Sequence, residues 1–167
     1  VQCGEVIGLD LVKRAGIRIP ANAIVSRQGF TRFVLGRELT MDNSEPYWRG
    51  VTVERKIFDK HLAFRAASAG AAVQADTKLL SVKMDGETVR ACLLSHQGDE
   101  VELSPKAIVA ADGVHSTLAK ELKAEFFSPK DVARGVEFEL VAKKEIPQCM
   151  QIFIEPEIGL GYGWIIP

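Results

Sequence analysis

Apolar and polar positions along the chain change their spacing several times, and each change predicts a different element. The clearest helical spacing lies in residues 55–70 (RKIFDKHLAFRAASAG), where the apolar positions are Phe58, Leu62, Ala66 and Ala69. Gly70 is a typical helix end, and the strand-like GVTVE of residues 50–54 leads directly into this helix. A second, shorter helix is predicted for residues 5–15 (EVIGLDLVKRA), with Gly16 as its end.

Strands are predicted where apolar residues alternate with polar ones, or where β-branched and aromatic residues gather. A three-stranded antiparallel meander with tight turns is predicted from the alternation in residues 77–84, 88–95 and 100–104. Residues 23–41 are broken by Gly29 and Gly36 into two short strands of another antiparallel sheet, and residues 42–50 form a polar loop. Further antiparallel strands of that second region are predicted at residues 136–142, 150–155 and 161–167.

One apolar run, residues 107–111 (AIVAA), does not alternate. Such a run is typical of a strand that is covered on both faces, as in parallel α/β sheets. Asp112-Gly113 follows immediately and predicts a tight loop at the carboxyl end of this strand. Ligands of such sheets gather at the carboxyl ends of the strands, so this loop is the first candidate site, with an ordinary surface turn as the alternative.

Composition narrows the class of protein. The chain has 167 residues, 47% of them hydrophobic, and a formal net charge of -1, which suits one substantial core and gives no bias towards nucleic acid. No run approaches the roughly 18 to 20 apolar residues of a membrane span, and the start has no signal-peptide pattern, so we expect a cytoplasmic location. The chain opens without methionine and closes on an apolar run, so we expect it to be an internal portion of a longer polypeptide.

Cysteines and histidines give little sign of metal or disulfide chemistry. Cys3, Cys92 and Cys149 are odd in number and far apart, which suits neither a disulfide framework nor a CxxC metal site, so we expect reduced thiols. Cys92 and Cys149 lie on or beside predicted strands and are expected to be packing residues. The three histidines have no second ligand at a useful spacing, and no metal site is predicted.

Four segments in order carry a resemblance to a known family: Cys-Gly-Glu at residues 3–5, R-x-x-F-D-x-x-L-A at 55–63, A-D-G-x-x-S at 111–116 and G-Y-G-W-I-I-P at 161–167. The chain resembles the geranylgeranyl reductase family of flavoproteins, within the larger group of FAD-dependent enzymes shaped like para-hydroxybenzoate hydroxylase. The resemblance implies the α/β (α+β) middle portion of a two-domain FAD-dependent oxidoreductase fold. Residues 1–22 and 53–122 would belong to the FAD domain, and residues 23–52 and 123–167 to the substrate domain.

FAD is the cofactor that the resemblance implies. Cys3 and Gly4 would lie beside the flavin ring, Arg55 near the FAD, and Asp112 and Gly113 at its ribityl and pyrophosphate side. Leu79 matches a position whose backbone lies near the adenine, and plain sheet core is its alternative. The family's GxGxxG unit and later Gly-Asp motif do not occur in this sequence, so we expect the chain by itself to bind FAD weakly or not at all.

The implied reaction is the reduction of isolated carbon-carbon double bonds in geranylgeranyl chains by reduced FAD, in membrane lipid synthesis. Tyr162 and Trp164, at alternate positions of one strand, would line the pocket of the isoprenoid lipid, or belong to ordinary sheet core. Cys3 would deliver a proton or shape the pocket, or be a buried hydrophobe. The partners would be an external electron donor, NAD(P)H or ferredoxin, and a membrane surface at which the protein associates peripherally.

Two alternatives to this function stay open. A flavin monooxygenase or electron-transfer flavoprotein dehydrogenase of the same superfamily would share Arg55 and Asp112-Gly113 but not the Cys-Gly-Glu and Tyr-x-Trp segments. A non-catalytic β-rich binding module would use every one of these motifs structurally. Absence of a flavin spectrum from the full-length protein would favour the second alternative.

Overall fold

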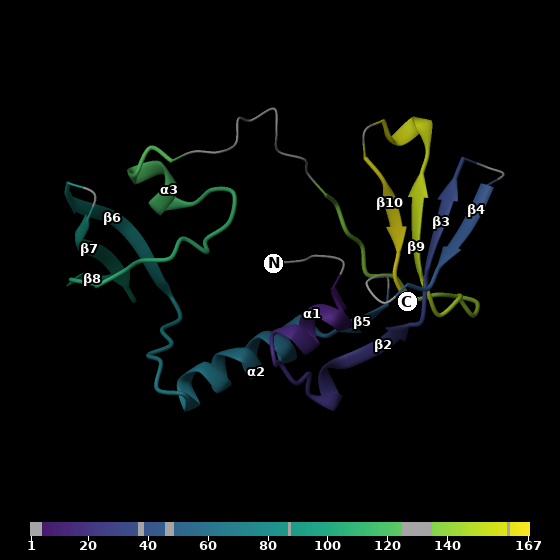
Figure 1. Cartoon of the computed structure of the whole chain (residues 1–167), viewed down its shortest axis with the longest axis horizontal. Coiled ribbons are helices and arrows are strands. Elements are labelled where there is room, and N and C mark those ends of the chain that lie inside the picture. Colours follow the sequence, from purple (N-terminus) through teal and green to yellow (C-terminus); the bar gives the residue numbers. More distant parts are fainter. Residues whose placement is uncertain (1–4, 37–38, 46–48, 87, 125–134, 160) are drawn as a thin grey trace. The chain divides into compact units, whose positions relative to one another are not determined.

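The computed structural model describes residues 5–36, 39–45, 49–86, 88–124, 135–159 and 161–167. Contacts divide the chain into two compact units, one of residues 1–71 with 135–167 and one of residues 72–134. Among the residues described, the first unit holds two small sheets and two α-helices, and the second holds one sheet and one short α-helix (Figure 1). The architecture is therefore a mixture of helices and small sheets within the described residues.

The first sheet has the strand order β1-β5-β2 and is antiparallel throughout. Its central strand, β5 (Gly50–Val53), is the predicted GVTV strand, and β1 (Val6–Gly8) and β2 (Ile24–Gln28) flank it. All four residues of β5 are buried. A central strand has its backbone groups paired on both sides, so β5 joins β1 and β2 into one sheet.

The beginning of the predicted helix over residues 5–15 is wrong. Residues Val6–Gly8 form β1, and the helix α1 spans only Leu9–Arg14. Pairing with β5 accounts for the difference, because the backbone of β5 offers hydrogen bonds to a segment that contains the β-branched Val6 and Ile7. Glu5 also has φ of 53°, a left-handed conformation that an α-helix does not contain.

The second helix, α2, spans Arg55–Ser68 and confirms the prediction from spacing. Its N-cap is Glu54, whose side-chain oxygen accepts a hydrogen bond of 3.0 Å from the backbone N–H of Lys56. Gly70 has φ of 95°, the left-handed conformation that glycine adopts without a steric cost at a helix end. Phe58 of α2 packs with the apolar face of the first sheet in a core of Ala23, Val51, Val53 and Phe58.

The second sheet has the order β10-β9-β3-β4 (Figure 1). β3 (Thr31–Leu35) pairs antiparallel with β4 (Leu39–Asn43) and parallel with β9 (Met150–Ile154), while β10 (Gly163–Ile165) pairs antiparallel with β9. The strands predicted near residues 150–155 and 161–167 are confirmed as β9 and β10. Residues 23–41 contribute to three strands instead of two, and β2 belongs to the first sheet. The predicted polar loop over residues 42–50 is wrong at its start, since β4 extends to Asn43.

The strand predicted for residues 136–142 is wrong, since this segment has no regular secondary structure. Its apolar side chains are strongly exposed: Val136 by 74%, Phe138 by 76%, Leu140 by 86% and Val141 by 97%. Alternation indicates that a segment is able to form a strand, but a strand also requires a neighbouring backbone. No described strand pairs with this segment.

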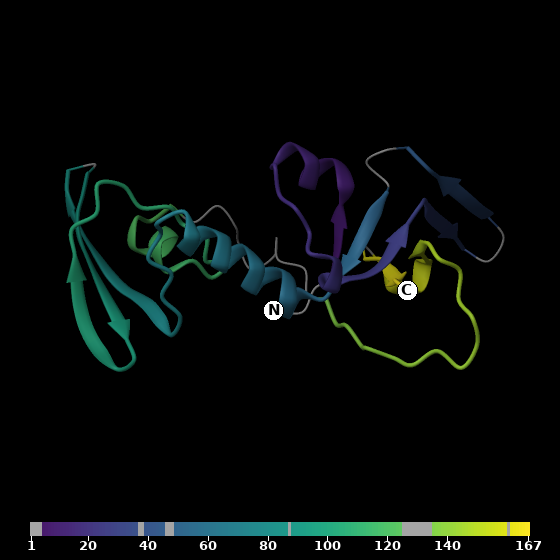
Figure 2. The same ribbon diagram turned by 90° about the horizontal axis from the view of Figure 1, so that it is seen from below.

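The second unit is built on the predicted meander, which is confirmed. β6 (Thr77–Asp85), β7 (Thr88–His96) and β8 (Asp99–Leu103) follow one another as an antiparallel sheet, the teal and green strands of Figure 2. Gln97 and Gly98, with φ of 51° and 96°, form the tight connection between β7 and β8. Two consecutive positive φ values are typical of the two-residue hairpin turns whose twist matches that of the strands.

The buried strand predicted for residues 107–111 is wrong. The segment is irregular, and Val109 is 85% exposed. A strand covered on both faces needs neighbouring strands on its two edges, and no described strand pairs with this segment. The short helix α3 (Thr117–Glu121) follows the Asp112-Gly113 loop and completes the unit.

Candidate functional site

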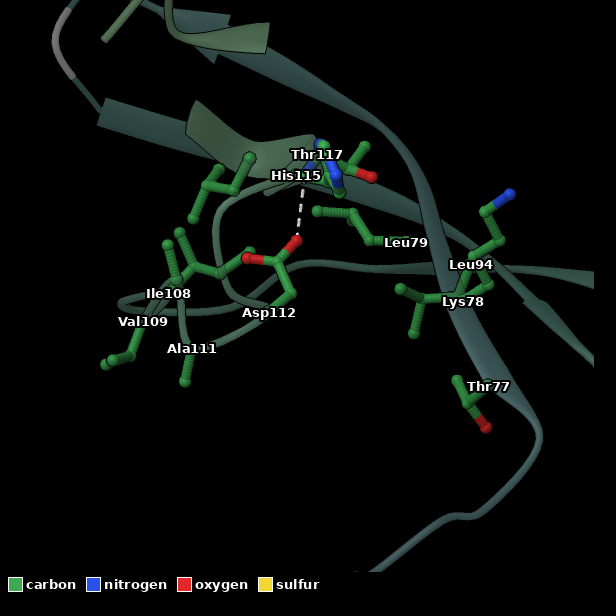
Figure 3. Close-up of a pocket in the computed structure, with 12 residues that line it drawn as sticks. Thr77, Lys78, Leu79, Leu94, Ile108, Val109, Ala111, Asp112, His115 and Thr117 are labelled. Atoms are coloured by element: carbon green, nitrogen blue, oxygen red, sulfur yellow. Dashed lines mark hydrogen bonds between the residues drawn. The ribbon is translucent and has the colours of Figure 1, made fainter. Parts of the chain in front are cut away.

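A cavity of about 520 Å³ lies in the second unit, between the meander and the segment that contains Asp112 (Figure 3). Leu79 and Leu94 line it from β6 and β7, and residues 108–112 and Leu118 line it from the other side. The walls are mostly apolar, with one carboxylate, that of Asp112, among them. A cavity of this size and composition suits a flat organic group that carries a few polar atoms.

The Asp112 carboxylate is fixed by the residues that begin α3. Its Oδ2 accepts a hydrogen bond of 2.8 Å from the backbone N–H of Thr117 (Figure 3). Ser116, which is the N-cap of α3, accepts a hydrogen bond of 3.0 Å from the N–H of Ala119. Hydrogen bonding from the Ser116 side chain, and then from the Thr117 N–H, lowers the pKa of Asp112. The carboxylate is thus held ionised and in one orientation beside the cavity.

Gly113 has φ of 79°, and no atom lies within 4 Å of the position that a Cβ would take. The loop therefore needs glycine for its backbone conformation and leaves open space beside it. Leu79 and Asp112, which the sequence places 33 residues apart, line the same cavity. Gly113 directly follows Asp112 in the chain, so three of the predicted cofactor positions come together in this unit.

Ser116 closes the A-D-G-x-x-S segment of the sequence, but no role was predicted for its side chain or for Thr117. The helix that they begin is short, and the apolar spacing on which a helix prediction depends is not present in five residues. A serine directly before a helix is a common N-cap signal, and this signal would have found Ser116.

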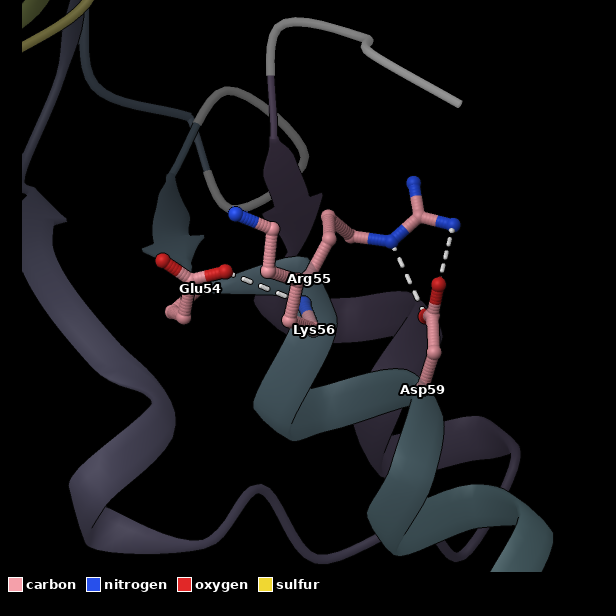
Figure 4. A network of polar contacts seen from close by, with 4 residues as sticks. All are labelled: Glu54, Arg55, Lys56 and Asp59. Carbon is pink, nitrogen blue, oxygen red and sulfur yellow. Dashed lines mark hydrogen bonds and ion pairs between the residues drawn. The ribbon is translucent and has the colours of Figure 1, made fainter.

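Arg55, the fourth predicted cofactor residue within the described ranges, lies in the first unit at the start of α2 (Figure 4). Its guanidinium donates two hydrogen bonds, of 2.9 and 3.0 Å, to the carboxylate of Asp59 one helical turn later. This pairing orients the planar guanidinium and leaves it only partly buried, with 30% of the side chain exposed. A fixed, partly exposed guanidinium suits an anionic ligand.

Carboxylates surround the same end of α2. Burial raises the pKa of Glu5, and the negative charges of Glu54, Glu137 and Glu139 raise it further, while Arg55 acts in the opposite direction. The predicted site residues Cys3 and Gly4 precede Glu5 in the chain and lie outside the described residues.

Tyr162 and Trp164 are neighbours in space as predicted, with ring centroids 5.9 Å apart and planes tilted by 53°. Trp164 belongs to β10, and Tyr162 directly precedes that strand with 58% of its surface exposed. Gly135 lies close to the indole, since a Cβ at this position would be 3.6 Å from Cη2 of Trp164. The pair forms an aromatic surface of the first unit that is open on the tyrosine side.

The remaining thiols are packing groups. Cys92 is 3% exposed and Cys149 is 0% exposed, and both are free. Burial raises the pKa of the Cys149 thiol, which therefore stays protonated. Within the described ranges, no group of three or more His, Cys, Asp or Glu side chains is arranged to hold a metal ion. None of the helices described is long and apolar enough to cross a membrane.

Comparison with known proteins identifies the family of the chain. The family model described as "FAD binding domain" matches residues 8–156, which is most of the sequence. The chain belongs to the FAD binding domain family. FAD is the cofactor that this membership implies.

Curated relatives are digeranylgeranylglycerophospholipid reductases of archaea. The protein of Methanocaldococcus jannaschii is 34% identical over 136 residues, which are 79% of this chain and 34% of the relative. The protein of Thermoplasma acidophilum is 25% identical over 173 residues, which are 100% of this chain and 44% of the relative. The chain thus spans less than half the length of these curated relatives.

Solved structures share the fold. A geranylgeranyl bacteriochlorophyll reductase-like protein from Thermoplasma acidophilum matches with a TM-score of 0.71 at 22% identity, over 100% of this chain and 44% of that structure. CmlS, a flavin-dependent halogenase, matches with a TM-score of 0.62 at 20% identity, over 96% of this chain and 29% of that structure. The three small sheets described above therefore correspond to a portion of the fold of FAD-dependent reductases and halogenases.

The lining of the cavity in the second unit can be compared with the chemistry of FAD. Its walls of Leu79, Leu94 and Ile108 suit a flat aromatic ring, which gains stability from apolar contact. An ionised carboxylate accepts hydrogen bonds from hydroxyl groups and repels phosphates, so Asp112 suits a hydroxyl-bearing part of the cofactor. The chemistry of this donor set is therefore compatible with FAD.

Proposed function

We propose that the protein is an FAD-dependent reductase that saturates carbon-carbon double bonds in the geranylgeranyl chains of membrane glycerophospholipids. The observation that carries the proposal is the Tyr162–Trp164 pair, an aromatic surface with ring centroids 5.9 Å apart in a chain of the FAD binding domain family. The identity of 34% to a digeranylgeranylglycerophospholipid reductase supports the lipid substrate.

In this proposal, the described residues hold the cofactor in two places. The backbone at Leu79 would lie near the adenine, Asp112 would accept hydrogen bonds from hydroxyl groups, and Gly113 would permit a close approach of the backbone. Arg55 would donate hydrogen bonds to phosphate oxygens or to the flavin edge, and its orientation by Asp59 supports that role. Gly4 lies outside the described residues, and its role beside the flavin ring stays a prediction.

Saturation of an isolated double bond adds a hydride to one carbon and a proton to the other. When bound and reduced, FAD supplies the hydride, and an external donor, NAD(P)H or ferredoxin, returns the two electrons. Cys3 would give the proton, since a thiol group carries a hydrogen that it can transfer as a general acid. Tyr162 and Trp164 hold the apolar chain and exclude water from the reacting carbons.

The test uses the full-length protein under anaerobic conditions. The purified protein is reduced, a digeranylgeranyl glycerophospholipid is added in detergent, and the mass of the lipid is followed. We expect the lipid to gain one hydrogen pair for each reduced double bond. A protein that is yellow but leaves the lipid mass unchanged contradicts the substrate, and oxygenation or electron transfer then becomes the stronger assignment.

Substitutions test whether the Tyr162–Trp164 pair, and not any exposed apolar side chain, binds the lipid. Trp164→Ala and Tyr162→Ala are expected to raise the KM for the lipid, because each removes a ring that contacts the chain. Phe64→Ala is the matched control, since Phe64 is an aromatic residue of α2 that is 71% exposed and has no place in the proposed pocket. Cys3→Ser is expected to lower kcat with little change in KM, because the weaker acid gives its proton more slowly.

A further inference from the structure

A buried group of polar side chains lies on the face of the first sheet that is opposite its apolar core. Val51 and Val53 of β5 belong to that core, and Thr52 between them therefore points to the other face. Ser26 and Gln28 of β2 pair with Thr52 and Gly50 and share this face. Gln28 is only 2% exposed and Thr52 only 6%. Polar side chains at such depth require hydrogen-bond partners.

The partner is the backbone carbonyl of Pro167. Thr52 Oγ1 donates to this carbonyl at 3.3 Å, and Ser26 Oγ also donates to it. Gln28 Nε2 donates to Ser26 Oγ at 2.6 Å and to Thr52 Oγ1 at 2.7 Å. The two hydroxyl oxygens lie 3.0 Å apart. We call Ser26, Gln28 and Thr52 the hydroxyl-amide cluster.

The directions of these hydrogen bonds follow from the chemistry of the groups. A carbonyl oxygen accepts only, so the hydroxyl hydrogens of Ser26 and Thr52 are directed toward Pro167. Their oxygens then accept from the two hydrogens of the Gln28 amide nitrogen, which fixes the orientation of that amide. Gln28 Oε1 has no partner among the described residues and faces Gly50, where a Cβ would lie 3.7 Å from it. The cluster is thus arranged to bind one acceptor at one position.

Pro167 lies three residues after Trp164 and two after the end of β10. β10 is a strand of only three residues at the edge of the second sheet, so its own ladder holds it on one side only. Proline has no N–H and contributes no ladder donor, which leaves its carbonyl as the hydrogen-bonding group at this point. The cluster therefore supplies a second anchor, from a different sheet, to the segment that carries Tyr162 and Trp164.

We propose that Ser26, Gln28 and Thr52 are positioning residues that hold the Tyr162–Trp164 surface in the place where it receives the substrate chain. The link to substrate rests on the proposed function, whereas the anchoring of the segment does not. Loss of the anchor lets the aromatic surface take several positions, which weakens its contact with an apolar chain.

The first experiment measures the anchor without substrate. The full-length protein is labelled with 5-fluorotryptophan, and the fluorine resonance of Trp164 is assigned by its disappearance in Trp164→Phe. Thr52→Val keeps the shape of the side chain and removes the hydroxyl, and we expect it to broaden or split this resonance. Thr52→Ser keeps the hydroxyl and is expected to retain the single wild-type resonance. Thr88→Val, an exposed position of β7, is the control for the same chemical change.

A second variant keeps the test valid should Thr52→Val fail to fold. Gln28→Glu conserves size but replaces the amide donor by an acceptor, which draws the hydroxyl hydrogens of Ser26 and Thr52 away from Pro167. It is expected to change the Trp164 resonance in the same way. A Trp164 resonance that is unaltered in every folded variant that disrupts the cluster overturns the proposal.

The second experiment measures turnover of the prenyl lipid. We expect Thr52→Val to raise KM about fivefold, the factor that corresponds to the net loss of one hydrogen bond, with a smaller effect on kcat. An altered resonance with an unchanged KM shows that the segment is anchored but refutes the role in substrate binding. If the wild-type protein leaves the lipid unchanged, the proposed function fails, while the fluorine measurement still decides the anchoring.

Discussion

Gly50→Ala is a substitution whose outcome is determined by the packing of the first sheet. Gly50 is buried at the start of β5, between Gly8 of β1 and Gln28 of β2. A Cβ built on Gly50 would lie 2.5 Å from Cγ1 of Val6 and 3.4 Å from the carbonyl oxygen of Ile7. Ordinary contacts between carbon atoms are roughly 3.5–4.0 Å, so the added methyl group is about 1 Å too close to Val6.

The expected cost follows from this overlap. Val6 has a stiff β-branched side chain, so relief requires a movement of β1 away from β5. Overpacking of this kind costs about 1–3 kcal/mol. Replacement of glycine by alanine at a compatible φ offsets about 0.4–1 kcal/mol by restricting the unfolded chain. We therefore expect Gly50→Ala to lower the free energy of unfolding by about 1–2 kcal/mol.

A double-mutant cycle assigns the effect to this contact. Urea unfolding is followed by circular dichroism at a constant FAD concentration, because bound cofactor alters the apparent stability. Val6→Ala removes Cγ1, so the double variant Val6→Ala/Gly50→Ala should show a coupling of about 1 kcal/mol in the direction of rescue. Gly29→Ala is the matched control, since no atom lies within 4 Å of its Cβ position, and it should be neutral or slightly stabilising.

Two results would refute this reasoning. One is a Gly50→Ala protein as stable as the wild type, which would mean that β1 yields without cost. The other is strict additivity of the two substitutions, which would mean that the loss arises elsewhere. Hydrogen exchange of the β1 and β5 amides provides an independent check, because the loss of protection should be concentrated in this sheet.

Three further predictions concern charge. The pKa of Asp112 is lowered, so the ionised carboxylate stabilises the fold above the ordinary aspartate pKa, and this contribution is lost only as pH falls through the lowered value. The amide resonance of Thr117, which donates to this carboxylate, should keep its chemical shift until that lower range. A change of the shift at the ordinary aspartate pKa would contradict the hydrogen bonding. The pKa of Glu5 is raised, so its effect on stability has the opposite pH dependence: stability should fall as pH rises from the ordinary glutamate pKa through the raised value. Melting temperatures measured over a pH series should show this fall in the wild type and not in Glu5→Gln. Arg55→Lys loses the two hydrogen bonds to Asp59 and should lower the free energy of unfolding by at most about 0.5 kcal/mol. Titration calorimetry should find weaker FAD binding by this variant. An unchanged affinity for FAD would contradict the proposed role of Arg55.

Local patterns in the sequence determined the elements whose stability is local. The spacing of Phe58 and Leu62 predicted α2, and the alternation between residues 77 and 103 predicted the meander, because each is formed by residues that are near neighbours in the chain. The same patterns were insufficient for residues 107–111 and 136–142. Both have the composition of a strand, but a strand exists only where another backbone completes its ladder, and that condition is not local.

The residues of the candidate site also fall into two groups, those that the sequence identified and those that only the structure brought together. The sequence alone supplied Asp112-Gly113, Arg55 and the Tyr162–Trp164 pair, because these residues stand in short segments that resemble a known family. Only the tertiary structure placed Leu79 on the same cavity as Asp112 and directed the hydroxyl-amide cluster toward Pro167. Hydroxyl and amide side chains carry no periodic signal, and their partners lie up to 141 residues away in the chain. Folding decides such contacts, because it brings distant backbone groups within hydrogen-bonding distance.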